Sequence, residues 1–329
     1  MPGLARREEM AGVHVHRVWM PGKSPAGWIG HTAASLPANA RLARGVDILH
    51  AHTFASAVPA MYSRRRYALP LVVTLHTSHF LMRAPKPGWR RIFRRIIAAA
   101  DYLLATSEEI RQVALDIYPH PRSEVMTNAV DTDRFAPGDV RDVGGRRRLI
   151  VPRRLFPKNG VEYFVRAMPL IAERADVEAR IVGDGPERDR LTALATELGV
   201  KERIEFTGAR PNHEMPGLLA AAELAVIPSL MEATSIAALE AMSCGTPVAA
   251  SAVGGLPEII DDGVGALFQP ANPAALAETV LALLQRSDLS NLGAEGRRRV
   301  VANWSLDRMV ERHLKIYSEL LDEATKKEP

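Results

Sequence analysis

Residues 223–253, ELAVIPSLMEATSIAALEAMSCGTPVAASAV, combine a short apolar strand, a turn, an apolar helix and a second apolar strand. Thr234 or Ser235 is the expected N-cap of the helix, and Gly245 before Pro247 marks its expected end. Strands that are apolar along their whole length, joined through a helix, are typical of a parallel sheet covered on both faces. This stretch therefore predicts an α/β fold made of βαβ units.

The same alternation of strand and helix patterns extends along the chain. The other strand-like runs are GVHVHRV (12–18), VDILHAH (46–52), LPLVVTLHT (69–77), DYLLATS (101–107), SEVMTNAV (123–130), RRRLIVPRRL (146–155), EARIVGDGP (178–186), RIEFTGA (203–209) and GALFQP (265–270). Helical patterns at 159–175 and 187–199 lie between some of these runs. The alternation predicts parallel, doubly wound sheets, and the number of strands is enough for two of them.

The domain boundary is expected in the polar, glycine-bearing segment 137–148. The balance of charge changes there, because residues 1–148 hold 22 Lys and Arg against 12 Asp and Glu, whereas the remainder is acidic. We therefore predict a first domain at 1–143 and a second at 144–304. Residues 305–329 are expected to form an amphipathic helix that packs back toward the first domain.

Composition limits the class of protein. The chain has 329 residues, of which 47% are hydrophobic and 24% charged, as expected for two globular cores. The single cysteine, Cys244, excludes a disulfide framework, and no apolar run approaches the ~18 residues of a membrane span. The charged opening MPGLARREEM is unlike a secretory signal, so we expect a cytoplasmic protein.

A basic helix is expected at 88–97. Arg90, Arg91, Arg94 and Arg95 share one face, opposite an apolar face of isoleucines and a phenylalanine. Two interpretations remain open: a helix that lies on the inner face of an anionic membrane, or an ordinary surface helix with solvated arginines. No recognised nucleic-acid motif accompanies the arginines, so no nucleic-acid partner is expected.

Glu232 and Glu240 are the charged residues of the opening stretch that matter most. Glu240 lies on a helix that starts just after the carboxyl end of a parallel strand, where open α/β sheets bind ligands and where helix amides favour a phosphate, and Glu232 lies just before that helix. Glu240 lies among apolar residues, and a buried carboxylate needs hydrogen-bond donors. A local arginine and the hydroxyls of a ligand both remain open as its partner.

Several motifs resemble the retaining, metal-independent GT-B glycosyltransferases of family 4. They are the segment 228–262, PRRLFPKNGVEYF (152–164), IVGDGPERDRL (181–191), FTGARPNHEMPGLLAAAELAVIPS (206–229), the terminal helix from Trp304 to Tyr317 and, in the first half, DILHAH (47–52), VVTLHTSHF (72–80), ATSEEI (105–110) and TNAVDTDRF (127–135). The resemblance covers nearly the whole chain. It implies two Rossmann-like domains with a cleft between them. It also implies transfer of a sugar from a UDP- or GDP-sugar to a glycan, lipid or small-molecule acceptor, with no cofactor.

The resemblance also implies roles for individual residues. Glu240 would hold the donor ribose and Glu232 the transferred sugar, while Arg154 and Lys158 would clamp the diphosphate. The other implied donor-site residues are the helix start Ser235, Ile236 and Ala237, then Arg210 against the base, Gly183 lining the cleft, and Asn159. On the acceptor side, His76 is the first choice and His79 the second. No protein nucleophile is expected.

Three departures from the family pattern stand out. Lys158 follows Arg154 by four positions instead of five, so either the loop shifts or Asn159, in the fifth place, faces the phosphate. Ser235 and Ala129 stand where glycine is common. The family normally opens with a strand, a glycine-rich loop and a long helix before a strand like 12–18, so the first domain is expected to be incomplete at its N-terminus.

Other functions remain open beside transfer. The chain could be a truncated nucleotide-sugar-binding protein without transferase activity, or an epimerase or hydrolase acting on a nucleotide sugar. A dehydrogenase is disfavoured because Gly183 and Gly185 lack the rest of the dinucleotide fingerprint. A metal site at His50, His52, His76 and His79 is not expected, because no cysteine accompanies the histidines.

Overall fold

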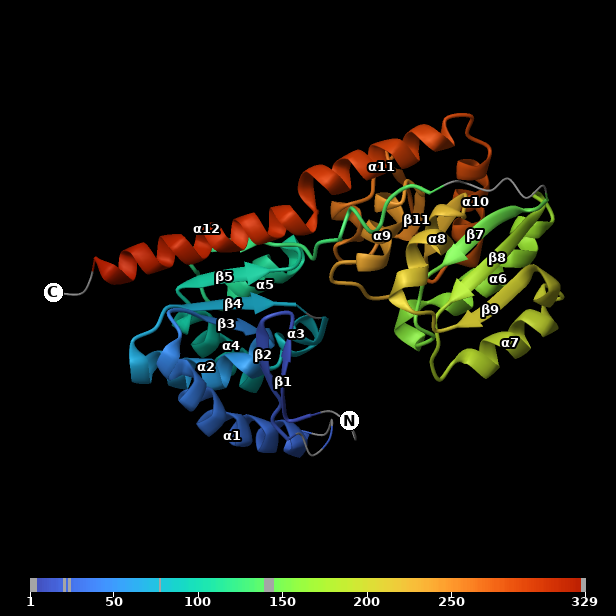
Figure 1. Cartoon of the computed structure of the whole chain (residues 1–329). Helices are drawn as coiled ribbons and strands as arrows, with labels where there is room; N and C mark the ends of the chain where they lie inside the picture. Colours follow the sequence, from blue (N-terminus) through green and yellow to red (C-terminus); the bar gives the residue numbers. More distant parts are fainter. Residues whose placement is uncertain (1–4, 20–21, 23–24, 77, 139–144, 327–329) are drawn as a thin grey trace. The chain divides into compact units, whose positions relative to one another are not determined.

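The structure is a computed structural model that describes residues 5–19, 22, 25–76, 78–138 and 145–326. The chain folds into two compact units (Figure 1). The first comprises Met1–Met126 together with His313–Pro329, and the second comprises Thr127–Arg312. Each unit contains a parallel sheet, as the alternating sequence pattern predicts.

The first unit is built on a four-stranded parallel sheet in the order β3-β4-β5-β6. Its strands are β3 (Leu49–His52), β4 (Leu71–Leu75), β5 (Tyr102–Ala105) and β6 (Ser123–Val125). Its helices are α1 (Pro25–Leu42), α2 (Thr53–Tyr67), α3 (Ser78–Arg83), α4 (Pro87–Ala99) and α5 (Glu108–Ile117). Every residue of β4 and β5 is buried, which explains why both strands are almost entirely apolar.

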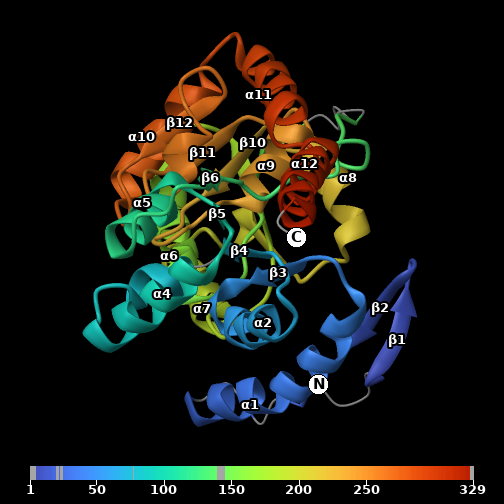
Figure 2. The same cartoon turned by 90° about the vertical axis from the view of Figure 1, so that its left-hand side faces the viewer.

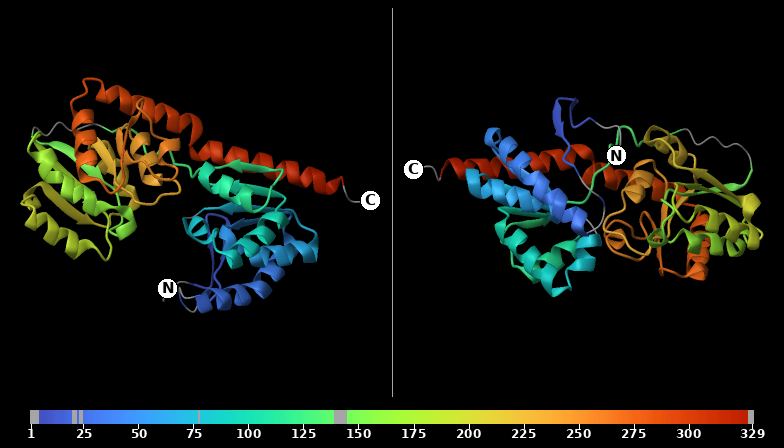
Figure 3. Two further views of the ribbon diagram at one scale, coloured as in Figure 1. Left: turned by 180° about the vertical axis from the view of Figure 1, so that it is seen from behind. Right: turned by 90° about the horizontal axis from the view of Figure 1, so that it is seen from below.

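The long C-terminal helix α12 (Leu306–Thr325) contributes to this first core (Figure 3). Ile316 and Leu320 are buried in one cluster with Val72 and Leu104 of the sheet. Near the end of the helix, Glu323 pairs with Arg122 at 2.7 Å. The second half of α12 therefore packs against the sheet of the first unit.

Residues 12–18 are not a strand of the parallel sheet, so that expectation is wrong. Instead β2 (Val13–His16) pairs antiparallel with β1 (Arg7–Met10), and Figure 2 shows this hairpin projecting beside α1. Val13 is 62% exposed. A histidine at every second position makes this run unfit for burial on both faces, which a strand inside a covered parallel sheet requires.

The second unit is built on a six-stranded parallel sheet in the order β12-β11-β10-β7-β8-β9. Its strands are β7 (Arg147–Val151), β8 (Val177–Val182), β9 (Ile204–Gly208), β10 (Leu224–Ile227), β11 (Val248–Ser251) and β12 (Gly265–Phe268). Its helices are α6 (Val161–Ala172), α7 (Arg188–Glu197), α8 (Met215–Ala220), α9 (Ile236–Ser243), α10 (Pro273–Leu284) and α11 (Leu289–Asn303). Both faces of this sheet carry helices, which makes it doubly wound.

Two apolar layers hold the second unit together. On one face, Leu149 and Val151 of β7 pack with buried residues of α6, α7 and α10. On the other face, Ile150 packs with residues of α8, α9 and α11. Successive residues of β7 therefore enter opposite layers, as the pleat of a strand requires.

The boundary between the units falls earlier than the predicted position at 143–144. The segment after β6 already belongs to the second unit, because Val130 bridges to Ser305 and Phe135 is buried against that core. Ser243 of α9 donates to the carbonyl of Phe135 at 2.5 Å. The prediction rested on the linker-like composition of residues 137–148. The contacts that attach the segment after β6 to the second unit involve only a few residues, so composition does not reveal them. Residues 139–144 of that predicted linker lie outside the described part of the chain.

Among the described residues, no helix combines the length and the apolar character that crossing a bilayer requires.

Candidate functional site

The candidate site lies at the carboxyl edge of the second sheet. Strand β7 has β10 on one side and β8 on the other, so the connections that leave these strands diverge at the β7–β10 boundary. Such a switch point is where doubly wound sheets bind ligands. The loops after β7 and β10 meet here, since the amide of Leu230 donates to the carbonyl of Lys158 at 2.9 Å.

Glu232 pairs with an arginine at this edge. The Nη2 of Arg153 contacts both the Ser229 hydroxyl and the Oε2 of Glu232. The side chains of Arg153 and Glu232 are only 11% and 17% exposed. Sequence reasoning missed Arg153, although it stands beside Arg154 in the same motif. The only signal was the doubled arginine directly after the strand.

The predicted diphosphate clamp occupies the turn after β7. Arg154 is exposed, with its guanidinium carbon 5.8 Å from the centre of the Phe156 ring. Lys158 is exposed on a one-turn helix, η2 (Pro157–Asn159). Asn159 is buried, and its Nδ2 donates to the Arg154 carbonyl at 2.6 Å. The Asn159 amide thus braces the turn, while the two cations remain at the surface.

The first turn of α9 presents backbone donors at the same edge. Ser235 is the N-cap, and its hydroxyl accepts a bond from the Ala238 amide at 3.3 Å. Within the described part of the chain, the amides of Ile236 and Ala237 meet no acceptor. Together with the positive end of the helix dipole, these amides suit an anion such as a phosphate.

Glu240 lies one turn further along α9 and is half-buried. Its carboxylate forms no hydrogen bond or ion pair with any described residue. Burial raises the pKa of Glu240 to about 7, and the charge of Arg134 opposes that rise only in part. A carboxyl group held in this way gains from any ligand that supplies hydrogen-bond donors.

Gly183 and Arg210 follow the neighbouring strands β8 and β9. A Cβ atom at Gly183 would lie 2.1 Å from the carbonyl oxygen of Arg153, so glycine is required there by the close approach of two backbones. Arg210 is exposed and lies 3.7 Å from Glu214. Both residues thus lie at the predicted edge, and Gly183 supports the turn that carries Arg153.

In the first unit, the predicted histidines gather at the ends of β3 and β4. The Nδ1 of His50 lies 2.5 Å from the Tyr317 hydroxyl and its Nε2 lies 2.7 Å from the Thr74 hydroxyl. The Nδ1 of His52 lies 2.7 Å from the Nε2 of His76. Burial, reinforced by the nearby histidines, lowers the pKa of His76 to about 4, which keeps this imidazole neutral at pH 7.

The structure adds one histidine, His313, to this cluster and places the second-choice histidine, His79, on α3. His313 of α12 joins the cluster, with its ring centre 5.5 Å from that of His50. Sequence reasoning missed it because more than two hundred and fifty positions separate the two residues along the chain. His79 is exposed on α3, whereas the ring of His76 stacks on that of His52 within the cluster, so His76 is the better placed of the two acceptor-side candidates. Within the described ranges, no group of side chains forms a metal site.

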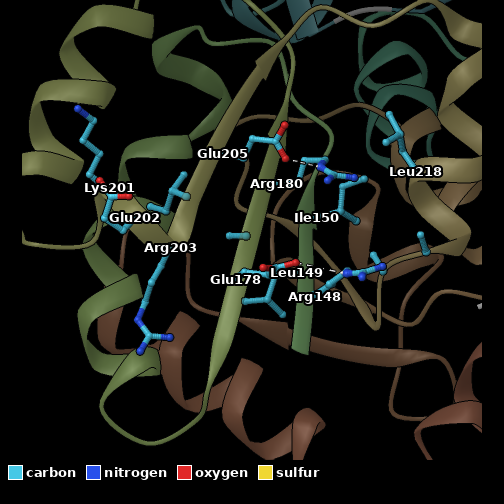
Figure 4. A pocket seen from close by; sticks show the side chains of 14 residues that line it. Arg148, Leu149, Ile150, Glu178, Arg180, Lys201, Glu202, Arg203, Glu205 and Leu218 are labelled. Atoms are coloured by element: carbon cyan, nitrogen blue, oxygen red, sulfur yellow. Dashed lines mark hydrogen bonds and ion pairs between the residues drawn. The ribbon is translucent and has the colours of Figure 1, made fainter. Parts of the chain in front are cut away.

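A cavity of about 370 Å³ lies elsewhere, between α8 and the face of β7, β8 and β9 (Figure 4). Its charges are largely paired across the strands, with Arg148 to Glu178 at 3.3 Å and Arg180 to Glu205 at 2.7 Å. Arg148, Glu178 and Glu205 lie in the first halves of their strands, away from the carboxyl edge. The cavity is therefore separate from the candidate site.

Comparison with protein families gives two matches. Residues 137–299 match the family Glycosyl transferases group 1, and residues 1–134 match Glycosyltransferase Family 4. The D-inositol 3-phosphate glycosyltransferase of Salinispora arenicola is 33% identical over 354 aligned positions, which cover 95% of this chain and 79% of that protein. The protein of the same name from Geodermatophilus obscurus is 34% identical, covering 91% of this chain and 72% of its own length.

Solved structures show the same fold. Sucrose-phosphate synthase from Thermosynechococcus elongatus superposes with a TM-score of 0.85 at 22% identity, covering 98% of this chain and 87% of that protein. Alr3699/HepE of Anabaena, determined in complex with UDP-glucose, superposes with a TM-score of 0.75 at 21% identity, covering 88% and 84% of the two chains. The predicted architecture of two Rossmann-like domains of the GT-B type is therefore confirmed.

Proposed function

Because the chain belongs to the group 1 glycosyl transferases of glycosyltransferase family 4, we propose that it transfers a sugar from a nucleoside-diphosphate sugar to an acceptor. The transfer proceeds with retention of anomeric configuration and without a metal ion. The observation that carries this proposal is Glu240, a half-buried carboxylate with no partner among the described residues, beside the free amides of α9.

The role proposed for Glu240 is to hold the ribose of the donor. Two hydroxyls of a ribose supply the donors that this carboxylate lacks within the protein. A hydrogen bond to a charged group contributes about 1.5–3 kcal/mol. Glu240 would therefore recognise the nucleoside part of the donor, whichever sugar is attached.

The diphosphate would lie between the turn after β7 and the first turn of α9. Arg154 and Lys158 are the exposed cations of that turn, and Ile236 and Ala237 supply the unpaired amides. As the bond to the sugar breaks, negative charge grows on the departing diphosphate. Fixed cations and helix amides stabilise that charge in the transition state.

The sugar itself would meet Glu232. One oxygen of this carboxylate, Oε2, is engaged by Arg153 and Ser229, and no hydrogen bond occupies Oε1 among the described residues. Glu232 can therefore pair with an arginine and still accept a hydrogen bond from a sugar hydroxyl. On the acceptor side, neutral His76 is proposed to orient the incoming hydroxyl.

The first donor and acceptor to test come from the similar proteins. HepE was determined with UDP and with UDP-glucose, so we propose a UDP-sugar as the first donor, with GDP-sugars next. The similar curated proteins are named D-inositol 3-phosphate glycosyltransferases, so a phosphorylated polyol is the first acceptor to try before glycans and lipids.

We also propose that the protein works in the cytoplasm with peripheral contact to an anionic membrane through α4. None of the arginines of this helix forms an ion pair in the described part of the chain. Arg90 donates to the Asp116 carbonyl at 2.6 Å and Arg94 lies over the Tyr118 ring, whereas Arg91 and Arg95, exposed like the other two, make no such contact with a described residue. Ile92, between them, is 41% exposed and could enter the interface.

The test is product analysis by mass spectrometry with a panel of UDP- and GDP-sugars, each offered with inositol 3-phosphate, glycan and lipid acceptors. A new glycoside that needs the protein and is lost in Glu240→Ala supports the proposal. Release of free sugar alone would indicate a hydrolase. Donor binding without any product across the panel would indicate a binding protein.

A further inference from the structure

We propose that Arg153 is a positioning residue for the donor sugar. With Ser229 it holds one oxygen of the Glu232 carboxylate, which fixes the other oxygen as an acceptor for a sugar hydroxyl. This role rests on the proposed function. Nothing in the family resemblance assigns a role to this position, since the resemblance places the diphosphate-binding arginine at Arg154.

Burial makes the pair mutually dependent. At 11% and 17% exposure, neither the guanidinium of Arg153 nor the carboxylate of Glu232 is well hydrated. Removing one partner of a buried ion pair leaves the other charge uncompensated, which is strongly unfavourable. The Nε of Arg153 is itself buried and meets no acceptor among the described residues, so the arginine lacks an alternative partner there.

The backbone around Glu232 is fixed as well. A Cβ at Gly254, which has φ of +53°, would lie 1.7 Å from the Glu232 carbonyl oxygen, so the two loops are in direct contact. The Gly255 amide donates to the Ala233 carbonyl at 3.1 Å, and the Ser251 hydroxyl donates to the Ser229 carbonyl at 2.5 Å. With loop and carboxylate both held, Glu232 is preorganised before any ligand binds.

The two glutamates of the site therefore differ in the free protein. Glu240 has no partner among the described residues, whereas Glu232 is already oriented by Arg153. Because Arg153 acts through Glu232, its loss should weaken binding of the nucleotide sugar and leave binding of the nucleoside diphosphate nearly unchanged. Arg154, one position along, offers a matched control because its proposed contact is the diphosphate, which both ligands share.

The experiment compares Arg153→Met, Arg153→Lys, Glu232→Gln, the double variant Arg153→Met/Glu232→Gln, and Arg154→Met. Calorimetry gives the Kd of the nucleoside diphosphate and of the nucleotide sugar that the wild type binds, UDP and UDP-glucose first. We expect Arg153→Met to weaken UDP-glucose about tenfold or more while UDP stays within about twofold. Arg153→Lys should restore part of the loss, and Arg154→Met should weaken both ligands alike.

Coupling to Glu232 is the second readout. The double variant should bind UDP-glucose no worse than Glu232→Gln alone, because the arginine has no role once the carboxylate is gone. Its melting temperature should exceed that of Arg153→Met, since the double variant leaves no buried unpaired charge. Should Arg153→Met fail to fold, the affinities of Arg153→Lys and Glu232→Gln for UDP and UDP-glucose decide whether Arg153 acts on the sugar through Glu232.

Equal weakening of UDP and UDP-glucose by Arg153→Met, or additive losses in the double variant, would overturn the positioning role while leaving the proposed function intact. A wild type that binds no nucleotide or nucleotide sugar overturns the proposed function first, and the sugar role of Arg153 with it. The melting temperatures would then still show whether the Arg153–Glu232 pair exists.

Discussion

The raised pKa of Glu240 makes ligand binding and stability depend on pH in a way that one substitution can isolate. The pKa rises from 4.5 to about 7 because the carboxyl is buried. Because the folded pKa is above the unfolded value, the contribution of this group to the free energy of unfolding is fully present below pH 4.5 and is lost as pH rises through 7. The shift corresponds to roughly 3 kcal/mol in the free energy of unfolding.

Glu240→Gln should therefore become more stable relative to wild type as pH rises from 5 to 8, by up to about 3 kcal/mol. Glu197→Gln, a change at an exposed position of α7, is the matched control and should show no such trend. Urea unfolding of the three proteins across this pH range gives the difference, because the contributions of all other groups cancel.

Ligand binding should follow the opposite course. Ribose hydroxyls donate to the ionised carboxylate, so the affinity of wild type for a nucleotide sugar should rise about tenfold or more between pH 5.5 and 8, with a proton released on binding near pH 6.5. A nucleotide sugar is preferred to a nucleoside diphosphate here, because a terminal phosphate titrates near pH 6. An affinity that is flat with pH, or one whose pH dependence survives in Glu240→Gln, would refute the reasoning.

Three more predictions follow from the structure. EDTA should leave donor affinity unchanged, because Arg154, Lys158 and the α9 amides supply the charge that a metal would provide; activity lost in EDTA and restored by manganese would contradict this. Arg91→Gln with Arg95→Gln should weaken sedimentation with anionic vesicles at low salt and leave neutral vesicles unaffected; equal binding of wild type to both kinds of vesicle would argue against membrane contact. Gly254→Ala should lower the free energy of unfolding by more than about 2 kcal/mol, because its Cβ would collide with the Glu232 carbonyl, whereas Gly217→Ala, whose Cβ meets nothing within 4 Å, should cost far less. Equal effects of the two alanines in urea unfolding would contradict the close approach.

Much of the fold is legible in the sequence because buried parallel strands are apolar along nearly their whole length. The strands β4, β5, β10 and β11 appear where their apolar runs predict them, and Ser235 caps α9. The hairpin at 7–16 is the exception, since an alternating Val-His pattern fits a half-exposed strand of either kind of sheet. Which strand pairs with which depends on contacts between residues that are far apart along the chain, so the local pattern does not decide it.

The candidate site was legible in part. The helix end and both glutamates follow from local patterns, but their partners do not. Arg153 and Glu232 are separated by 79 positions, and only the juxtaposition of β7 and β10 brings them together. The same holds for His313, which reaches His50 only because α12 packs on the first sheet. Long-range contacts of this kind leave no signal in spacing or composition.

The most direct test of the account is calorimetry of Glu232→Ala and Glu240→Ala with a nucleoside diphosphate and with its nucleotide sugar. Both variants are first checked for folding by circular dichroism. Glu240→Ala should weaken the two ligands alike, by about 1.5–3 kcal/mol. Glu232→Ala should weaken the nucleotide sugar and leave the diphosphate within about 0.5 kcal/mol of wild type. Equal losses for both ligands in Glu232→Ala, or unchanged binding in Glu240→Ala, would contradict the assignment of one glutamate to the sugar and the other to the ribose.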